Sequence, residues 1–425
     1  MSILPLPSLN ALITKTIKAR KKATAALSQQ DKMHTMHYTL NGFGRLPAPM
    51  LERINRSLEA STADQYPHAD AHLRLIMAMS NKFKQPLTLE KLPKLRQEFA
   101  TNMVSMQDPK VWKQSNGASK LTTSDKVYWQ DKLIADADGG DMTIRCYQQS
   151  KHDSGIQGFN KQAADQTVML FFHGGGFCIG DLDTHHEFCY RVCAITGWSV
   201  VSVDYRLAPE HPAPTALRDC LSAYAWLAEH CHTLGALPSR IVLAGDSAGG
   251  CLAISVAQQL SAPDATQWAN LGLDEDRIIT MLQDLPRPLA QLPLYPVTDI
   301  EAEHLSWGLY GQGLFLDHND VEVFDAAYMQ QIPLAQSHAL VSPMHGNNAQ
   351  ICPSYIIAAE LDILRDEALV YAKQLQEKDI EVKTYTVLGA PHGFIHLLSV
   401  HQGIGRETDY IIKEFSHFVR QLLVA

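Results

Sequence analysis

A serine set among small residues is the strongest chemical signal in the sequence. Gly245-Asp246-Ser247-Ala248-Gly249-Gly250 follows the apolar run 241–244 and precedes an apolar, helix-like run at 251–257. This order predicts a strand, a tight turn and a helix, the setting in which Gly-x-Ser-x-Gly presents a nucleophilic serine. Amide groups at the start of the helix would face the negative charge that develops during attack. We therefore predict that Ser247 is a nucleophile.

A serine hydroxyl needs a base to take its proton and an acid to orient that base. His392 lies in a Pro-His-Gly loop directly after the last expected strand, which makes it the candidate base. Asp362 lies at the carboxyl end of the preceding expected strand and is the candidate acid, with Glu360 as the competitor two residues earlier. The carboxyl ends of parallel strands meet at one edge of a sheet, so Ser247, Asp362 and His392 can converge there.

A glycine run after another apolar stretch could bind the oxyanion of a tetrahedral intermediate. His173-Gly174-Gly175-Gly176 follows residues 168–172. Without side chains, backbone amides can approach a ligand closely, and such donors often contribute the largest catalytic effect. The predicted donors are the amides of Gly174, Gly175 and Ala248. We expect His173, directly after a buried strand, to brace this loop by hydrogen bonds rather than act as a base.

Metal chemistry has weaker support in the sequence. His185, His186 and Cys189 are possible ligands, but adjacent side chains on a helix point about a hundred degrees apart. An obvious fourth ligand is missing from this stretch. We therefore expect no metal and no other cofactor.

The elements that would position these residues follow an α/β pattern. A short antiparallel hairpin is expected at 126–148, before a polar loop at 151–166. The alternation of strands and helices that follows predicts a mostly parallel central sheet with helices on both faces. Strands are expected at 167–172, 198–205, 241–246, 290–297, 354–361 and 382–388, and helices at 213–230, 248–260, 365–379 and 405–424. An insertion at 262–289 has no role that the sequence reveals.

The first 125 residues carry helical patterns, for example near 9–17, 50–58 and 72–79, and no strand pattern. We divide the chain into an N-terminal helical part, 1–125, and a catalytic α/β domain, 126–425. The helical part could be a lid over a pocket or a stabilising surface layer. Residues 302–345 are rich in aromatic side chains and could line a pocket as a second cap segment, or pack as a surface excursion.

Composition excludes several partners. Lys and Arg number 36 against 45 Asp and Glu among 425 residues, a net charge of −9 that disfavours nucleic acid and anionic membranes. No apolar run approaches the eighteen or so residues of a membrane span. The basic cluster at 15–22 follows apolar residues, the reverse of a secretory signal, so we expect a cytoplasmic protein. The eight scattered cysteines predict buried, reduced thiols. The sequence does not decide between a monomer and a homodimer.

Four motifs together resemble the hormone-sensitive-lipase-like family of α/β-hydrolase esterases, whose bacterial members are often called family IV. They are His173-Gly174-Gly175-Gly176, Asp204-Tyr205-Arg206-Leu207-Ala208-Pro209-Glu210, Gly245-Asp246-Ser247-Ala248-Gly249-Gly250 and Pro391-His392-Gly393-Phe394. The resemblance covers about residues 125 to 425. It implies an α/β-hydrolase fold with a helical cap, the triad Ser247, Asp362 and His392, and an oxyanion hole from Gly174, Gly175 and Ala248. Asp204, Tyr205 and Arg206 would brace the loop that carries Gly174.

The function implied by this resemblance is hydrolysis of carboxylic esters, with a short- to medium-chain acyl ester as the expected small-molecule substrate. An amide deacylase or a longer-chain lipase would use the same triad, so those alternatives stay open. A non-catalytic receptor of this fold is disfavoured, because the gibberellin receptors have lost the histidine that His392 supplies here.

Overall fold

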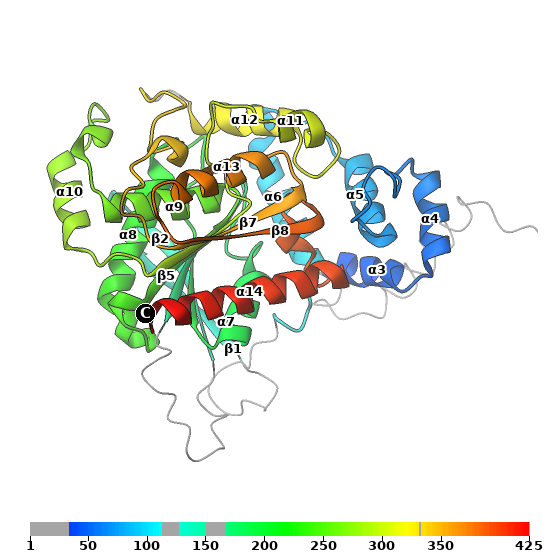
Figure 1. Ribbon diagram of the computed structural model, residues 1–425, viewed down its shortest axis with the longest axis horizontal. Helices are drawn as coiled ribbons and strands as arrows, with labels where there is room; N and C mark the ends of the chain where they lie inside the picture. Colours follow the sequence, from blue (N-terminus) through cyan, green and yellow to red (C-terminus); the bar gives the residue numbers. More distant parts are fainter. Residues whose placement is uncertain (1–33, 113–126, 150–166, 331–332, 425) are drawn as a thin grey trace, which may run out of the picture.

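The computed structural model describes residues 34–112, 127–149, 167–330 and 333–424, and its centre is an eight-stranded sheet (Figure 1). The strand order is β1-β2-β4-β3-β5-β6-β7-β8. The hairpin β1–β2 is antiparallel and also pairs antiparallel with β4, whereas β3 to β8 run parallel. The mostly parallel sheet, the hairpin and the α/β-hydrolase fold predicted from the sequence are confirmed. The strands are β1 Val127–Ala135, β2 Asp141–Gln149, β3 Val168–Phe172, β4 Ser199–Val203, β5 Ile241–Asp246, β6 Ala290–Leu294, β7 Ser354–Leu361 and β8 Val382–Pro391.

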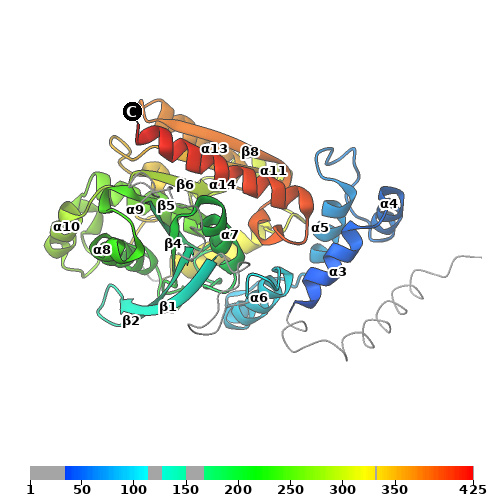
Figure 2. The same cartoon turned by 90° about the horizontal axis from the view of Figure 1, so that it is seen from below.

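The central strands are apolar throughout because helices cover both faces of the sheet. In β3, Leu170 and Phe172 join the hydrophobic cluster on one face, and Met169 and Phe171 join the cluster on the other. This alternation follows from the two-residue period of a strand. Helices α8, α9 and α13 pack on the first face, and α7 and α14 on the second (Figures 1 and 2). Their bounds are α7 His186–Thr196, α8 Thr215–His230, α9 Ala248–Ser261, α13 Arg365–Gln376 and α14 Gln402–Leu422.

Four of these helices match the sequence prediction within a few residues, whereas α7 was not predicted. The insertion at 262–289 contains a short 3-10 turn and the helix α10, Glu275–Asp284. Trp268 of this insertion is fully buried and donates its indole N–H to Gln259 Oε1 of α9 at 2.9 Å. The insertion therefore extends the core on the face covered by α9.

Within the described residues 34–112, the N-terminal part contains helices, as predicted, and no strand. Figures 1 and 2 both place α3, α4 and α5 beyond one end of α14, on the side away from the C-terminus. The helix expected near 9–17 and the loop expected at 151–166 lie outside the described residues. The helices are α3 Thr35–Gly44, α4 Ala48–Ser57, α5 Ala71–Phe83 and α6 Leu92–Met106, with a 3-10 turn, η1, at Leu89–Lys91.

Polar side chains join these helices to the sheet domain. Asn41 donates to the backbone carbonyl of Ser399 at 2.7 Å. His401 pairs with Asp70 at 3.1 Å. Lys84 forms ion pairs with Asp317 and Asp320 of the segment 302–345. The N-terminal helices are therefore fixed both to the start of α14 and to the second proposed cap segment.

The segment 302–345 contains α11, Leu305–Tyr310, and α12, His318–Tyr328. Tyr328 stacks on Phe177, with ring centroids 3.8 Å apart, and so packs on the loop that follows β3. Ser306 donates its hydroxyl to the backbone carbonyl of Ile363 at 2.6 Å, on the loop that follows β7. The segment thus spans loops at the carboxyl edge of the sheet.

Asp325 of α12 provides a stability prediction that depends on pH. Burial raises the pKa of Asp325 to about 7, whereas an unfolded aspartate titrates near its usual value of about 4. Between these pH values the folded state keeps a proton that the unfolded state has released, so Asp325 makes stability fall as pH rises. We expect Asp325→Asn to raise Tm by several degrees at pH 8 and by less at pH 5, measured by calorimetry. Glu322→Gln, an exposed position of the same helix, is the control; an equal gain at both pH values for Asp325→Asn would contradict the prediction.

All eight cysteines are buried and none forms a disulfide, which confirms the expectation of buried, reduced thiols. Across the described ranges, no helix combines the length and the apolar character needed to cross a bilayer.

Candidate active site

The turn between β5 and α9 holds Ser247 in a strained backbone conformation. Its φ is 54° and its ψ is −120°, a region that residues other than glycine rarely occupy. A Cβ on Gly245 would lie 2.1 Å from the backbone oxygen of Gly249, and a Cβ on Gly249 would lie 2.0 Å from that of Phe172. The two glycines are therefore required by close backbone contact. The sharp turn leaves the serine hydroxyl at the carboxyl edge of the sheet.

The two other predicted triad residues lie next to this hydroxyl. His392 Nε2 is 2.9 Å from Ser247 Oγ, and His392 Nδ1 is 2.8 Å from Asp362 Oδ2. Asp362 is 1% exposed, while Ser247 and His392 are 7% and 9% exposed. The acid is therefore shielded from water, and the serine and the imidazole keep a slight exposure. The second oxygen of Asp362 accepts the amide of Leu364 at 2.9 Å, which fixes the carboxylate.

Glu360, the competing acid, has a different set of partners. It contacts His68 Nδ1 at 2.7 Å and accepts the amide of Gly389. Its side chain therefore joins the N-terminal part to the end of β8, and Asp362 is the carboxylate that contacts the imidazole.

The glycine loop after β3 departs from the prediction at one residue. The amide of Gly174 donates to Asp246 Oδ1 at 2.8 Å, so this N–H is already engaged and the assignment of Gly174 as an oxyanion donor is corrected. In the described part of the chain, the amides of Gly175 and Gly176 have no backbone or side-chain acceptor. Both glycines have positive φ, 120° and 57°. The amide of Ala248, at the first position of α9, has no acceptor within the helix.

His173 braces the loop, as predicted. Its ring stacks on Tyr205, with centroids 4.3 Å apart, and its Nδ1 lies 2.9 Å from the carbonyl of Gly174. The hydroxyl of Tyr205 donates to the carbonyl of His173 at 2.6 Å. Burial, together with nearby His185, lowers the pKa of His173 to about 4. The buried, neutral ring of His173 therefore has a structural role and does not act as a catalytic base.

Two arginines, Arg206 and Arg96, make polar contacts around this loop. Arg206 binds Asp219 of α8 in a bidentate pair, whereas the Tyr205 hydroxyl is bonded to the glycine loop, so among the described contacts Tyr205 is the member of the predicted Asp-Tyr-Arg group that braces it. Arg96 of α6 donates to the carbonyls of Cys178 and Ala208, which ties the loop to the N-terminal helices. The sequence carried no signal for Arg96, because its partners lie 82 and 112 residues away.

A family model described as the α/β-hydrolase fold matches residues 169–396. Lipase 2 of Moraxella sp. strain TA144 is 62% identical over 432 aligned positions, which cover 100% of this chain and 98% of the relative. The carboxylic ester hydrolase LipN of Mycobacterium tuberculosis is 36% identical over 58% of this chain and 61% of its own length.

Solved structures of esterases have the same architecture. A Pyrobaculum calidifontis esterase superposes with a TM-score of 0.64 at 24% identity, covering 84% of this chain and all of that one. EstE1, described as a thermostable carboxylesterase cloned from a metagenomic library, has a TM-score of 0.60 at 26% identity and covers 78% of this chain and 97% of its own.

Proposed function

This chain belongs to the α/β-hydrolase fold family, among its hormone-sensitive-lipase-like esterases, and we propose that it hydrolyses carboxylic esters through an acyl-enzyme on Ser247. The observation that carries this proposal is the position of His392, whose two ring nitrogens lie within hydrogen-bond distance of Ser247 and Asp362. Such an arrangement is what general-base activation of a serine requires.

In the proposed reaction His392 Nε2 takes the proton of Ser247 as Oγ attacks the ester carbonyl. Asp362 holds Nδ1 and stabilises the positive ring that forms, without taking the proton itself. The tetrahedral intermediate collapses, the C–O bond to the alcohol breaks, and His392 protonates the leaving oxygen. Water then attacks the acyl-enzyme with His392 again acting as base, which releases the carboxylic acid and restores the Ser247 hydroxyl.

We assign the oxyanion hole to the amides of Gly175, Gly176 and Ala248. The first two follow the loop that Asp246 and Tyr205 hold in place, and the third begins α9. These donors are oriented before substrate binds, so no reorganisation is needed when the negative charge develops.

The helical segments around the site support a cap in two parts, 34–112 and 302–345. The second segment packs on the loops after β3 and β7, and Lys84 joins the first to the second. Enclosure from several sides limits the length of the acyl chain that can fit, so we propose short- to medium-chain esters as substrates.

A cytoplasmic location and a homodimer remain predictions from the sequence.

Initial rates on p-nitrophenyl esters of increasing acyl length test this substrate range. We expect kcat/KM to be highest at four to eight carbons and to fall by more than about tenfold at sixteen carbons, because surplus methylenes have no enclosed apolar space. An optimum at sixteen carbons would favour the second candidate, a long-chain lipase, which the 62% identity to Lipase 2 supports. The p-nitroanilide of the best acyl group is the control for an amide deacylase.

A further inference from the structure

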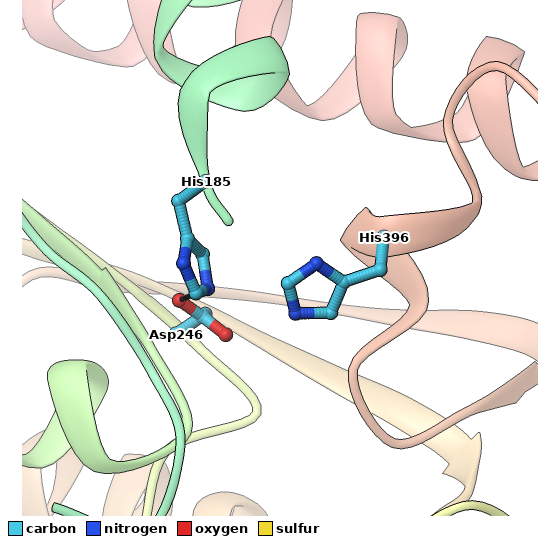
Figure 3. A group of neighbouring side chains, drawn as sticks. All are labelled: His185, Asp246 and His396. Atoms are coloured by element: carbon cyan, nitrogen blue, oxygen red, sulfur yellow. Dashed lines mark ion pairs between the residues drawn. The ribbon is translucent and has the colours of Figure 1, made fainter. Parts of the chain in front are cut away.

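Three side chains that the proposed reaction does not use converge behind the nucleophile (Figure 3). His185 precedes α7, Asp246 ends β5, and His396 lies in the 3-10 turn η8, Phe394–Leu397. One ligand atom from each lies within 4.8 Å of the other two. The rings of His185 and His396 approach the Asp246 carboxylate from two sides, and His185 Nε2 is 3.1 Å from Asp246 Oδ1.

The hydrogen bonds of Thr184 assign the tautomer of His185. The Thr184 hydroxyl donates its proton to the carbonyl of Asp181 at 2.7 Å, so it can only accept from His185 Nδ1, 2.8 Å away. Nδ1 is therefore the donor in this contact, and Nε2 is the ring nitrogen that faces Asp246. This Nε2 is buried, and its contact with Asp246 Oδ1 lacks the geometry of a good hydrogen bond.

A lone pair 3.1 Å from a carboxylate oxygen is repulsive unless a positive charge lies between them. The amide of Gly174 also donates to Oδ1, so this oxygen already acts as a hydrogen-bond acceptor. Either a second proton on His185 or a metal cation can supply the missing positive charge.

His396 favours the metal, because it brings a second imidazole to the same carboxylate and so places three ligand atoms around one point. Its ring also hydrogen-bonds the backbone carbonyl of Thr184, the kind of outer contact that orients a metal-bound imidazole. An ion pair between His185 and Asp246 alone would need only two of these three side chains.

A small cavity lies beside the cluster and is lined by His185, His396 and the polar side chains of Gln107 and Glu187. It offers room for the water that completes a three-ligand site. Two imidazoles, one carboxylate and an open position suit a borderline divalent ion. We propose that His185, Asp246 and His396 bind one divalent transition metal ion of the zinc class.

This site differs from the one considered in the sequence. Both ring nitrogens of His186 are engaged, at 3.0 Å each, by the Tyr147 hydroxyl and the Val111 carbonyl, so His186 is not a ligand. A bound ion would fix Asp246, which holds the loop of Gly174, to the turn that follows His392. Its expected effect is on stability, because an ion that binds only the folded state raises Tm.

Titration calorimetry and elemental analysis on the full chain, stripped with a chelator and then given Zn²⁺, test the proposal. We expect one ion per chain, visible d–d absorption when Co²⁺ replaces zinc, and a Tm that rises with Zn²⁺. His396→Gln should weaken zinc binding by about a hundredfold or more and remove the Tm rise, since even outer contacts contribute ten- to a hundredfold.

The matched control is His417→Gln, an exposed histidine of α14, which should bind zinc like the parent protein. The proposal is overturned if the parent protein binds no stoichiometric zinc, a result that does not depend on the folding of any variant. It is also overturned if His396→Gln binds zinc as tightly as the parent; His185 and Asp246 would then form an ion pair with a second proton on the ring.

Discussion

Replacing Ser247 with alanine lowers kcat on a short-chain p-nitrophenyl ester by roughly five to six orders of magnitude, as expected for loss of the nucleophile of a triad. The acyl-enzyme cannot form without Oγ, and the remaining oxyanion donors and substrate contacts give only slight catalysis. The backbone at Ser247 is already strained, and alanine keeps the same backbone demands, so the fold should be retained. Circular dichroism and Tm establish that retention.

Ser255→Ala is the matched control, because Ser255 is a buried serine two turns further along α9. It should keep most of the parent activity. If Ser247→Ala kept more than a tenth of the parent kcat while folded, another group would be the nucleophile, and the mechanism proposed for this site would be wrong.

Replacing Asp362 with asparagine lowers kcat by about four orders of magnitude. The amide cannot offset the positive charge on His392, and its NH₂ group favours the ring tautomer that turns a proton toward Ser247. The carboxylate accepts from both His392 Nδ1 and the amide of Leu364, and asparagine preserves its size, so the loss should appear mainly in kcat. Steady-state kinetics on the same ester measure it.

Glu360→Gln separates the two candidate acids on the same strand. Glu360 contacts His68 and Gly389, not His392, so this substitution should change kcat by less than about tenfold. The reverse order of effects, with Glu360→Gln the more damaging variant, would reassign the acid.

The parts of the site that the sequence predicts are those with strong local patterns. The apolar run before Ser247 and the small residues around it require a strand, a tight turn and a helix, and the structure has β5 and α9 at those positions. Asp362 was preferred to Glu360 because of its place at the end of a strand, and the contacts agree with that choice.

The parts that the sequence did not predict depend on long-range contacts or on ambiguous local signals. The amide of Gly174 is engaged by Asp246, 72 residues further along the chain, a contact that no local pattern indicates. The helices predicted from the sequence did not include α7, although Gly197 ends it with a φ of 76°.

Labelling with a fluorophosphonate tests the central claim most directly, because the reagent phosphonylates only a serine that a neighbouring base has made nucleophilic. The account predicts one covalent adduct per chain, found by peptide mass spectrometry on Ser247, and slow or absent labelling in Asp362→Asn. A folded protein that stays unlabelled, or an adduct on a different residue, would contradict the account.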